Sequence, residues 1–197
     1  MSAASGGVAD LAEVMARLRR ECAWTAAQTH ESLTRYLLEE AHEVLAAFDG
    51  GDPNEVRDEL GDLLFQVVFH AQVASERPAA DGGFDLDDVA AGIAAKLRRR
   101  NPHVFAGGEA RTPEEIDAAW QAVKAQEATR ASVHDGIPLA LPALMYADKV
   151  LKRLGDPKVE GDDLGSRLLA LVAEARAAGL DPEAELRRTV RALPDLP

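Results

Sequence analysis

The sequence is poor in cysteine, in aromatic residues and in positive charge. Cys22 is the only cysteine among 197 residues, so an intramolecular disulfide is excluded and a reducing cytoplasm is the expected compartment. Lys and Arg number 22 against 34 Asp and Glu, which leaves a net charge of −12. So acidic a chain is not expected to bind nucleic acid or an anionic membrane through its bulk charge. A small anionic substrate would need a local basic patch or a metal ion.

Long apolar runs, strand patterns and several familiar motifs are also missing. No apolar stretch approaches the roughly 18 residues of a membrane span, so no membrane contact is expected. The alternation typical of strands is nearly absent. There is no Gly-rich phosphate loop, nucleophile elbow or Cys/His zinc pattern. With 47% hydrophobic and 5% aromatic residues, the composition is that of a soluble globular protein.

Helical periodicity, in contrast, recurs along the chain. The spacing of apolar residues predicts helices at about 8–21, 31–48, 53–75, 86–100 and from 113 onwards, with weaker helical patterns at 164–178 and 182–193. Residues 22–30 and 103–108 are expected to be loops, and Pro138, Pro142 and the glycines that follow are expected to break the segment after Ser132. The fold class predicted from these helices is all-α, a helical bundle.

The predicted organisation has three parts. Residues 1–9 are expected to be a flexible leader, residues 10–131 a catalytic helical domain, and residues 132–197 a C-terminal helical appendage. The run Asp163-Leu-Gly-Ser166 loosely echoes Glu59-Leu-Gly-Asp62. The appendage is therefore predicted to be a degenerate second copy of the first unit.

Two pairs of carboxylates stand out within the helices. Glu40 and Glu43 are three residues apart, as are Glu59 and Asp62, so each pair lies on one helix face. A short turn separates the two helices, and the pairs lie at comparable distances from it, so they are expected to face each other. Oxygen ligands of this kind suit Mg²⁺ or Mn²⁺. From spacing alone, a metal site and a solvated acidic face remain equally good interpretations.

The remaining candidate site residues have basic or aromatic side chains. Lys96 and Arg100, four apart on one face, could hold phosphate oxygens, although compensation of the helix dipole explains them adequately. Trp24 and Trp120 fill a core or stack on a base. His70 is interpreted as a packing histidine.

Several motifs in one order resemble the MazG family. They are Cys22-Ala-Trp24, Gln28-Thr-His30-Glu-Ser-Leu, Glu39-Glu40-x-x-Glu43-Val, Glu59-Leu-Gly-Asp62-Leu-Leu-Phe, Lys96-Leu-x-Arg-Arg100-x-Pro-His103-Val-Phe105 and Trp120-x-x-x-Lys124. The resemblance covers about residues 11–143. It implies an all-α nucleoside triphosphate pyrophosphohydrolase whose bundle is completed by dimerisation, as a homodimer or higher homo-oligomer.

The resemblance also implies a reaction and its residues. Water attacks the α-phosphorus of a (d)NTP to give (d)NMP and pyrophosphate, with Mg²⁺ (or Mn²⁺ as a substitute), broad base specificity and a house-cleaning role in the nucleotide pool. The implied metal ligands are Glu40, Glu43, Glu59 and Asp62; Glu39 acts on water; Lys96 and Arg100 contact phosphates; Trp120, Lys124, Trp24, Gln28 and His30 lie near the nucleotide.

The sequence departs from the family pattern in two places. Ala23 and Thr25 stand where the family has Pro and Asp, and Ser166 stands where a second unit would have its aspartate. We therefore expect one active site per chain. Two alternatives stay open: a related hydrolase with a narrower substrate such as dUTP, dCTP or phosphoribosyl-ATP, and a non-catalytic protein that keeps the fold as a dimeric scaffold.

Overall fold

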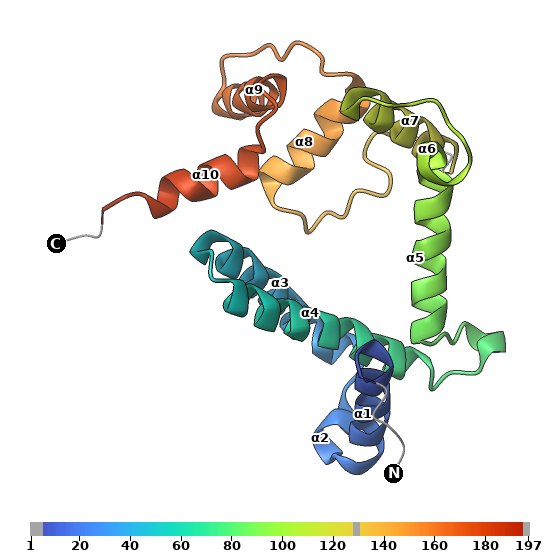
Figure 1. Cartoon of the computed structure of the whole chain (residues 1–197). Coiled ribbons are helices and arrows are strands. Elements are labelled where there is room, and N and C mark those ends of the chain that lie inside the picture. The colour runs from blue at the N-terminus through green and yellow to red at the C-terminus, as the bar shows by residue number, and fades with distance from the viewer. Residues whose placement is uncertain (1–5, 128–130, 195–197) are drawn as a thin grey trace. The chain divides into compact units, whose positions relative to one another are not determined.

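A computed structural model describes residues 6–127 and 131–194, and these are helical with no strand among them (Figure 1). The elements in order are α1 (Val8–Glu21), α2 (Ala23–Ala27), α3 (His30–Gly50), α4 (Pro53–Ala74), η1 (Ala79–Asp81), α5 (Leu86–Arg100), α6 (Pro102–Phe105), α7 (Pro113–Gln126), α8 (Ala143–Leu154), α9 (Leu164–Ala177) and α10 (Pro182–Arg191). The predicted all-α class is confirmed.

The contacts divide the chain into two compact units, Met1–Val123 and Lys124–Pro197. Helix α7 runs across this division. The predicted functional boundary between residues 131 and 132 stays a prediction. Within the described ranges, no helix has both the length and the apolar character needed to cross a membrane.

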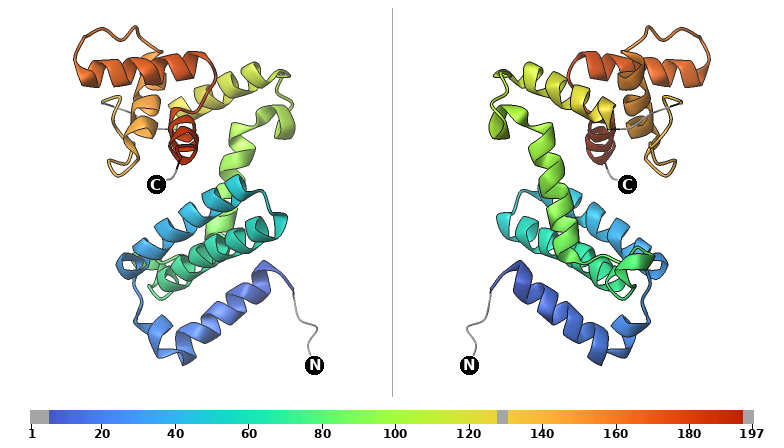
Figure 2. Two further views of the ribbon diagram at one scale, coloured as in Figure 1. Left: turned by 90° about the vertical axis from the view of Figure 1, so that its left-hand side faces the viewer. Right: turned by 90° about the vertical axis from the view of Figure 1, so that its right-hand side faces the viewer.

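Helices α3 and α4 form an antiparallel hairpin, as the sequence predicts (Figure 2). Helix α3 ends because Gly51 adopts the left-handed conformation, with φ 76°. Asp52 then caps α4 by accepting a hydrogen bond from the Asn54 backbone N–H, and Pro53 occupies the first turn. These two signals fix a short turn, and the short turn fixes which residues of α3 and α4 lie opposite one another.

Other helices begin at side-chain caps. The Thr29 hydroxyl accepts from the Ser32 N–H while Ser32 Oγ accepts from the Thr29 N–H, so α3 begins with a reciprocal capping box. Asp85 precedes the helical pattern at 86–100, a position that predicts an N-cap, and it forms the same arrangement with Asp88 at α5. Thr112 and Glu115 form it at α7.

The core of the first unit joins α1 to the hairpin. Met15 from α1 packs with Leu33 from α3 and with Val68 and Phe69 from α4, and all four are buried. The partly buried residues around this cluster are Leu11, Tyr36, Phe65, Val73 and Leu86. The end of the hairpin distant from its turn is therefore the end held by apolar packing.

The apolar residues between Leu60 and Ala71 predict that α4 is the most buried helix. Val68 and Ala71 are buried, but Leu60, Leu64 and Val67 are 44%, 37% and 38% exposed. The prediction is therefore wrong for one face of α4. Apolar residues surround much of α4, and α1 and α3 cover only part of that surface.

Three helical segments contradict the sequence prediction. Residues 22–30 include α2, held by the Thr25 hydroxyl, which donates to the Leu18 and Cys22 carbonyls. Pro102 begins α6 and Pro142 precedes α8, where loops or breaks were expected. Proline lacks an N–H that the first helical turn leaves unpaired in any case, so it starts these helices rather than ending them.

The second unit has its own small core and a polar clamp. Ile137, Leu151 from α8 and Val172 from α9 are buried. Arg176 on α9 pairs with Asp148 on α8 and, at 2.7 Å, with Asp156 in the loop after it. The clamp ties α9 to α8.

Phe69 is fully buried, and its truncation is expected to destabilise the first unit strongly. Phe69→Ala should lower the free energy of unfolding by about 3–5 kcal/mol, because it removes apolar burial and leaves a cavity. Urea denaturation followed by circular dichroism measures this. Phe105→Ala, at a side chain that is 59% exposed, should change the value by less than about 0.5 kcal/mol. A small effect at Phe69 would show that the α1–α4 core is not the main source of stability.

Candidate metal centre

The α3–α4 hairpin brings carboxylates from both helices to one place. Glu40 and Glu43 on α3 and Glu59 on α4 each offer an oxygen, and these three oxygens lie within 4.8 Å of one another. Glu40 and Glu59 are half-buried and Glu43 is exposed. The predicted meeting of the two pairs is thus present for three of the four acids.

Asp62, the fourth acid, lies beside this cluster. It is exposed, and its charge acts on both Glu40 and Glu59. It is one helical turn from Glu59 on the same face of α4, as their spacing requires. Asp62 is therefore close enough to act on the cluster electrostatically, although its oxygens are not among the three that meet.

The electrostatics of the cluster are those of acids without a compensating cation. The pKa of Glu40 is raised by burial first, then by the charges of Asp62 and Glu43 and by a hydrogen bond with Glu43. The pKa of Glu59 is raised by burial and then by Glu43, Asp62, Asp58 and Glu55. Every contribution to these two shifts comes from desolvation or from an acid. The residues therefore fit a divalent cation, which would reverse each of these contributions.

The donor set narrows the choice of cation. All the contributing atoms are carboxylate oxygens, which suit hard ions such as Mg²⁺ or Mn²⁺ rather than zinc. An exposed edge, at Glu43 and Asp62, would leave room for water or phosphate oxygens on the ion. Glu39 adjoins Glu40 on α3, is exposed, and adds to the repulsion that Glu40 experiences.

Of the two basic candidates, Arg100 contacts Trp120, and neither is among the groups that act on the carboxylate cluster. The Arg100 guanidinium lies over the Trp120 ring, 5.1 Å from its centroid, so α5 and α7 bring these two together. Lys96 is exposed one turn earlier on α5. Neither Lys96 nor Arg100 is among the groups that shift the pKa of Glu40 or Glu59. Lys124 follows Trp120 by one turn of α7, at the start of the second unit.

Trp24 and Gln28 lie beside the core of the hairpin. Trp24 meets the rings of Tyr36 and Phe69 edge-on, with centroids 5.9 Å and 6.3 Å away, and remains 50% exposed. The Gln28 amide donates to the Trp24 carbonyl and accepts from Ser32 Oγ. One face of Trp24 is thus fixed while half of its surface stays open.

His70 and Gln66 are two polar residues whose surroundings the sequence did not indicate. The predicted packing histidine, His70, contacts His30 through a hydrogen bond of 2.8 Å between their Nδ1 atoms. Gln66 is 2% exposed, and its Oε1 has no hydrogen-bond partner. Both continue the row of α4 that begins at Glu59 and Asp62, at steps of three or four residues, which is the signal that could have found them.

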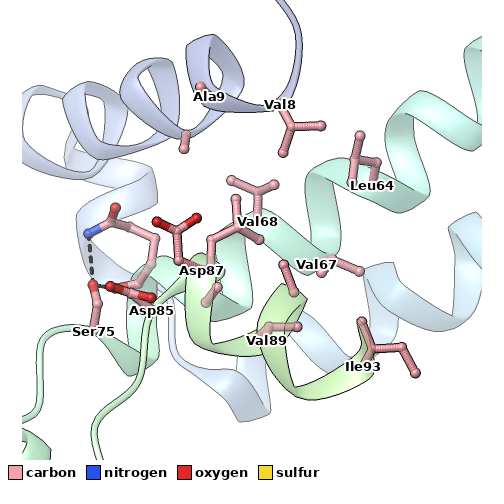
Figure 3. Close-up of a pocket in the computed structure, with 15 residues that line it drawn as sticks. Val8, Ala9, Leu64, Val67, Val68, Ser75, Asp85, Asp87, Val89 and Ile93 are labelled. Atoms are coloured by element: carbon pink, nitrogen blue, oxygen red, sulfur yellow. Dashed lines mark hydrogen bonds between the residues drawn. The ribbon is translucent and has the colours of Figure 1, made fainter. Parts of the chain in front are cut away.

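A groove of about 630 Å³ lies on a different face of the first unit (Figure 3). Apolar side chains from α1, α4 and α5 line it, including Val8, Leu64, Val67 and Ile93, with Asp85 and Asp87 at its edge. None of the predicted site residues lines this groove. It is apolar where the candidate metal centre is charged.

The sequence and structure match one family of known proteins. Residues 28–105 match the sequence model of the MazG nucleotide pyrophosphohydrolase domain. A crystal structure of a mazG-related protein from Thermotoga maritima superposes with a TM-score of 0.51 and 30% sequence identity, covering 59% of this chain and 98% of that one.

Curated relatives extend the match over most of the chain. The nucleoside triphosphate pyrophosphohydrolase/pyrophosphatase MazG of Thermotoga maritima is 34% identical over 213 residues, covering 92% of this chain and 80% of that protein. The nucleoside triphosphate pyrophosphohydrolase of Escherichia coli K12 is 44% identical over 161 residues, covering 79% of this chain and 60% of its own length. The one from Mycolicibacterium smegmatis is 40% identical, and the chain spans 55% of its length.

Mg²⁺ is expected to stabilise the chain near neutral pH and to lose this effect in acid. Because the pKa values of Glu40 and Glu59 are raised in the folded state, the metal-free fold loses stability as pH rises from the ordinary glutamate value through the raised values. A cation bound to the ionised acids offsets that loss. Free Mg²⁺ at about 100 times its Kd should add about 2.7 kcal/mol. Calorimetric Tm values with EDTA or Mg²⁺, at about pH 7 and about pH 4.5, measure this difference.

Glu40→Gln separates repulsion from metal binding. The substitution removes one repelling charge, so the Tm of the variant in EDTA should equal or exceed that of the wild type. The increase in Tm on adding Mg²⁺ should be smaller in the variant. Glu114→Gln alters an exposed glutamate outside the hairpin and should keep the full gain. An equal Mg²⁺ gain in all three proteins would contradict the assignment of Glu40 as a ligand.

Proposed function

Because the chain belongs to the MazG family of nucleotide pyrophosphohydrolases, we propose that it hydrolyses nucleoside triphosphates. The proposed reaction is attack of water on the α-phosphorus of an NTP or dNTP, which releases the monophosphate and pyrophosphate. The proposed role is to clear the nucleotide pool, in a reducing cytoplasm and with little preference among bases.

The observation that carries the proposal is the meeting of Glu40, Glu43 and Glu59, with Asp62 beside them. Acids on facing helices repel one another, and this repulsion together with burial raises the pKa of Glu40 and of Glu59. We propose that these four hold Mg²⁺, with Mn²⁺ as a substitute. When bound, the ion would neutralise phosphate oxygens and lower the pKa of a water molecule.

The remaining side chains supply binding and proton transfer. Glu39 adjoins the cluster and is proposed to accept the proton of the attacking water. Lys96 and Arg100 are proposed to stabilise the negative charge that develops on pyrophosphate. Arg100 lies in the last turn of α5 together with Arg98 and Arg99, and Lys96 lies one turn earlier, so this helix end concentrates positive charge in an otherwise acidic unit.

Exposed aromatic side chains support the proposed lack of base preference. Trp120 with Lys124, and Trp24 with Gln28 and His30, are the proposed contacts to the nucleotide. Trp24 is half exposed beside a rigid aromatic cluster. Stacking on an indole accepts every base, because each base has a π-face. Hydrogen bonds to the edges of the base would then change the preference among bases only slightly.

The reaction is tested by its products. Incubation with each NTP and dNTP in Mg²⁺ should yield the monophosphate and pyrophosphate at comparable rates. Glu59→Gln or Asp62→Asn should lower kcat/KM by at least about 100-fold, because each removes a proposed metal ligand. Loss of a residue that only hydrogen-bonds to a metal ligand already lowers metal affinity or activity by about 10–100-fold. Glu114→Gln should retain full activity.

Three outcomes would contradict parts of the proposal. Release of orthophosphate and a diphosphate would exclude attack at the α-phosphorus. Turnover of dUTP, dCTP or phosphoribosyl-ATP alone would identify a narrower hydrolase. Absence of Mg²⁺-dependent nucleotide binding in calorimetry would identify a scaffold without catalysis.

We also propose that the chain associates as a homodimer. Exposed apolar side chains follow the hairpin: Leu38, Leu45 and Phe48 on α3, and Leu60, Leu64 and Val67 on α4. Exposed apolar surface of this extent is typical of an interface between proteins. A second copy covering it would complete the bundle that one chain leaves partly open.

Sedimentation equilibrium tests the association. The expected mass is at least twice the 21.1 kDa of one chain. Leu64→Lys should shift the equilibrium toward the monomer, because it places a charge in the interface, and Leu139→Lys, at a side chain that is 89% exposed in the second unit, should not. A monomeric mass at every concentration would contradict the dimer.

A further inference from the structure

His30 and His70 form a hydrogen bond of well-defined geometry. His30 begins α3 and His70 lies one turn before the end of α4, so the antiparallel hairpin brings them together. Their Nδ1 atoms are 2.8 Å apart, their ring planes differ by 4°, and their centroids are 5.1 Å apart. The centroid separation exceeds the nitrogen separation by about two ring radii. The rings therefore lie edge to edge in nearly one plane, which aligns an N–H···N bond.

This geometry couples the proton positions of the two rings. One Nδ1 must carry the proton and the other must present its lone pair. When both rings are neutral, the donor ring has no proton on Nε2, and the acceptor ring has its proton on Nε2. Choosing the donor therefore sets the tautomer of both histidines.

Burial decides which ring is the donor. His70 Nε2 is buried and has no hydrogen-bond partner, whereas His30 is exposed. A buried N–H without an acceptor is rarer than a buried acceptor atom without a donor, and it costs more free energy. His70 therefore donates through Nδ1 and keeps a bare Nε2. His30 accepts at Nδ1 and carries its proton on Nε2, on the exposed side of its ring.

The surroundings keep His70 neutral. A further proton could enter only at His70 Nε2, and burial, followed by the nearby His30, lowers the pKa of His70. From α1, Arg19 donates to the Gln28 carbonyl and pairs with Glu76, beyond the end of α4, so this pair contributes little net charge. Glu31, next to His30, is the other charged neighbour on α3. The lowered pKa means that protonation is delayed to a lower pH.

We propose that His70 is a positioning residue for the nucleotide site, holding the His30 ring in place and fixing its tautomer so that His30 presents a neutral Nε2–H donor. The proposal rests on the proposed function for the presence of His30 in that site. A neutral donor suits an uncharged acceptor, such as a base carbonyl or a sugar oxygen. A histidinium would instead suit a phosphate.

The tautomers can be measured without any substrate. Two-bond ¹H–¹⁵N spectra of the ¹⁵N-labelled full chain should show His70 protonated on Nδ1 and His30 on Nε2. The His70 ring should remain neutral below the ordinary histidine pKa of about 6.5, because burial lowers its pKa. Finding His70 protonated on Nε2, or finding His30 protonated on Nδ1 alone, would overturn the proposal whether or not the chain hydrolyses nucleotides.

Kinetics test the positioning role. In His70→Phe, nothing holds the His30 ring or fixes its tautomer, so KM should rise about tenfold with kcat nearly unchanged. His70→Asn, whose amide can donate in place of Nδ1–H, should restore most of the loss. His134→Asn, at a histidine bonded to Tyr146 in the second unit, should match the wild type.

The outcomes separate this proposal from the proposed function. An unchanged KM in His70→Phe, or no rescue by Asn, would overturn the positioning role while leaving the reaction intact. An inactive wild-type chain with the expected tautomers would contradict the reaction, and the spectra would still support the hydrogen-bonded pair. If His70→Phe fails to fold, the spectra of the wild type remain the deciding measurement.

Discussion

The structure of the first unit depends on holding acids together against their own repulsion. Glu40, Glu43 and Glu59 have oxygens within 4.8 Å of one another, and Asp62 adds to the field. The hairpin holds these acids close together through a capped turn at one end and an apolar core at the other. Burial and mutual repulsion raise the pKa values of Glu40 and Glu59. A divalent cation would be attracted by the same charges, so we assign the proposed function to this cluster.

Two different features keep α3 and α4 in register, one at each end of the hairpin. At the turn, Gly51 and Asp52 end one helix and begin the next without a long loop. At the other end, Phe69 and its neighbours pack against α1, and His30 bonds to His70. The acids lie between these fixed ends. A hairpin held only at its turn could splay, and the acids would then separate.

Local signals allowed much of this to be predicted from the sequence. Caps such as Asp85 and the i,i+3 spacing of the acids depend on neighbouring residues alone, so the helix ends and the carboxylate faces could be predicted. The helix after Pro142 was missed because proline both ends and begins helices, and only the packing of the second unit decides which. The exposed Leu60 and the His30–His70 bond could not be predicted, because each depends on which distant segments pack against α4.

Anomalous diffraction from crystals of the full chain soaked in Mn²⁺ shows whether the carboxylate cluster binds a cation. We expect an anomalous peak bounded by Glu40, Glu43, Glu59 and Asp62, with oxygen distances of about 2.2 Å. A map with no peak there, and with these carboxylates paired to lysine or arginine side chains, would contradict the proposed metal centre. The acids would then be a structural network and not a cation site.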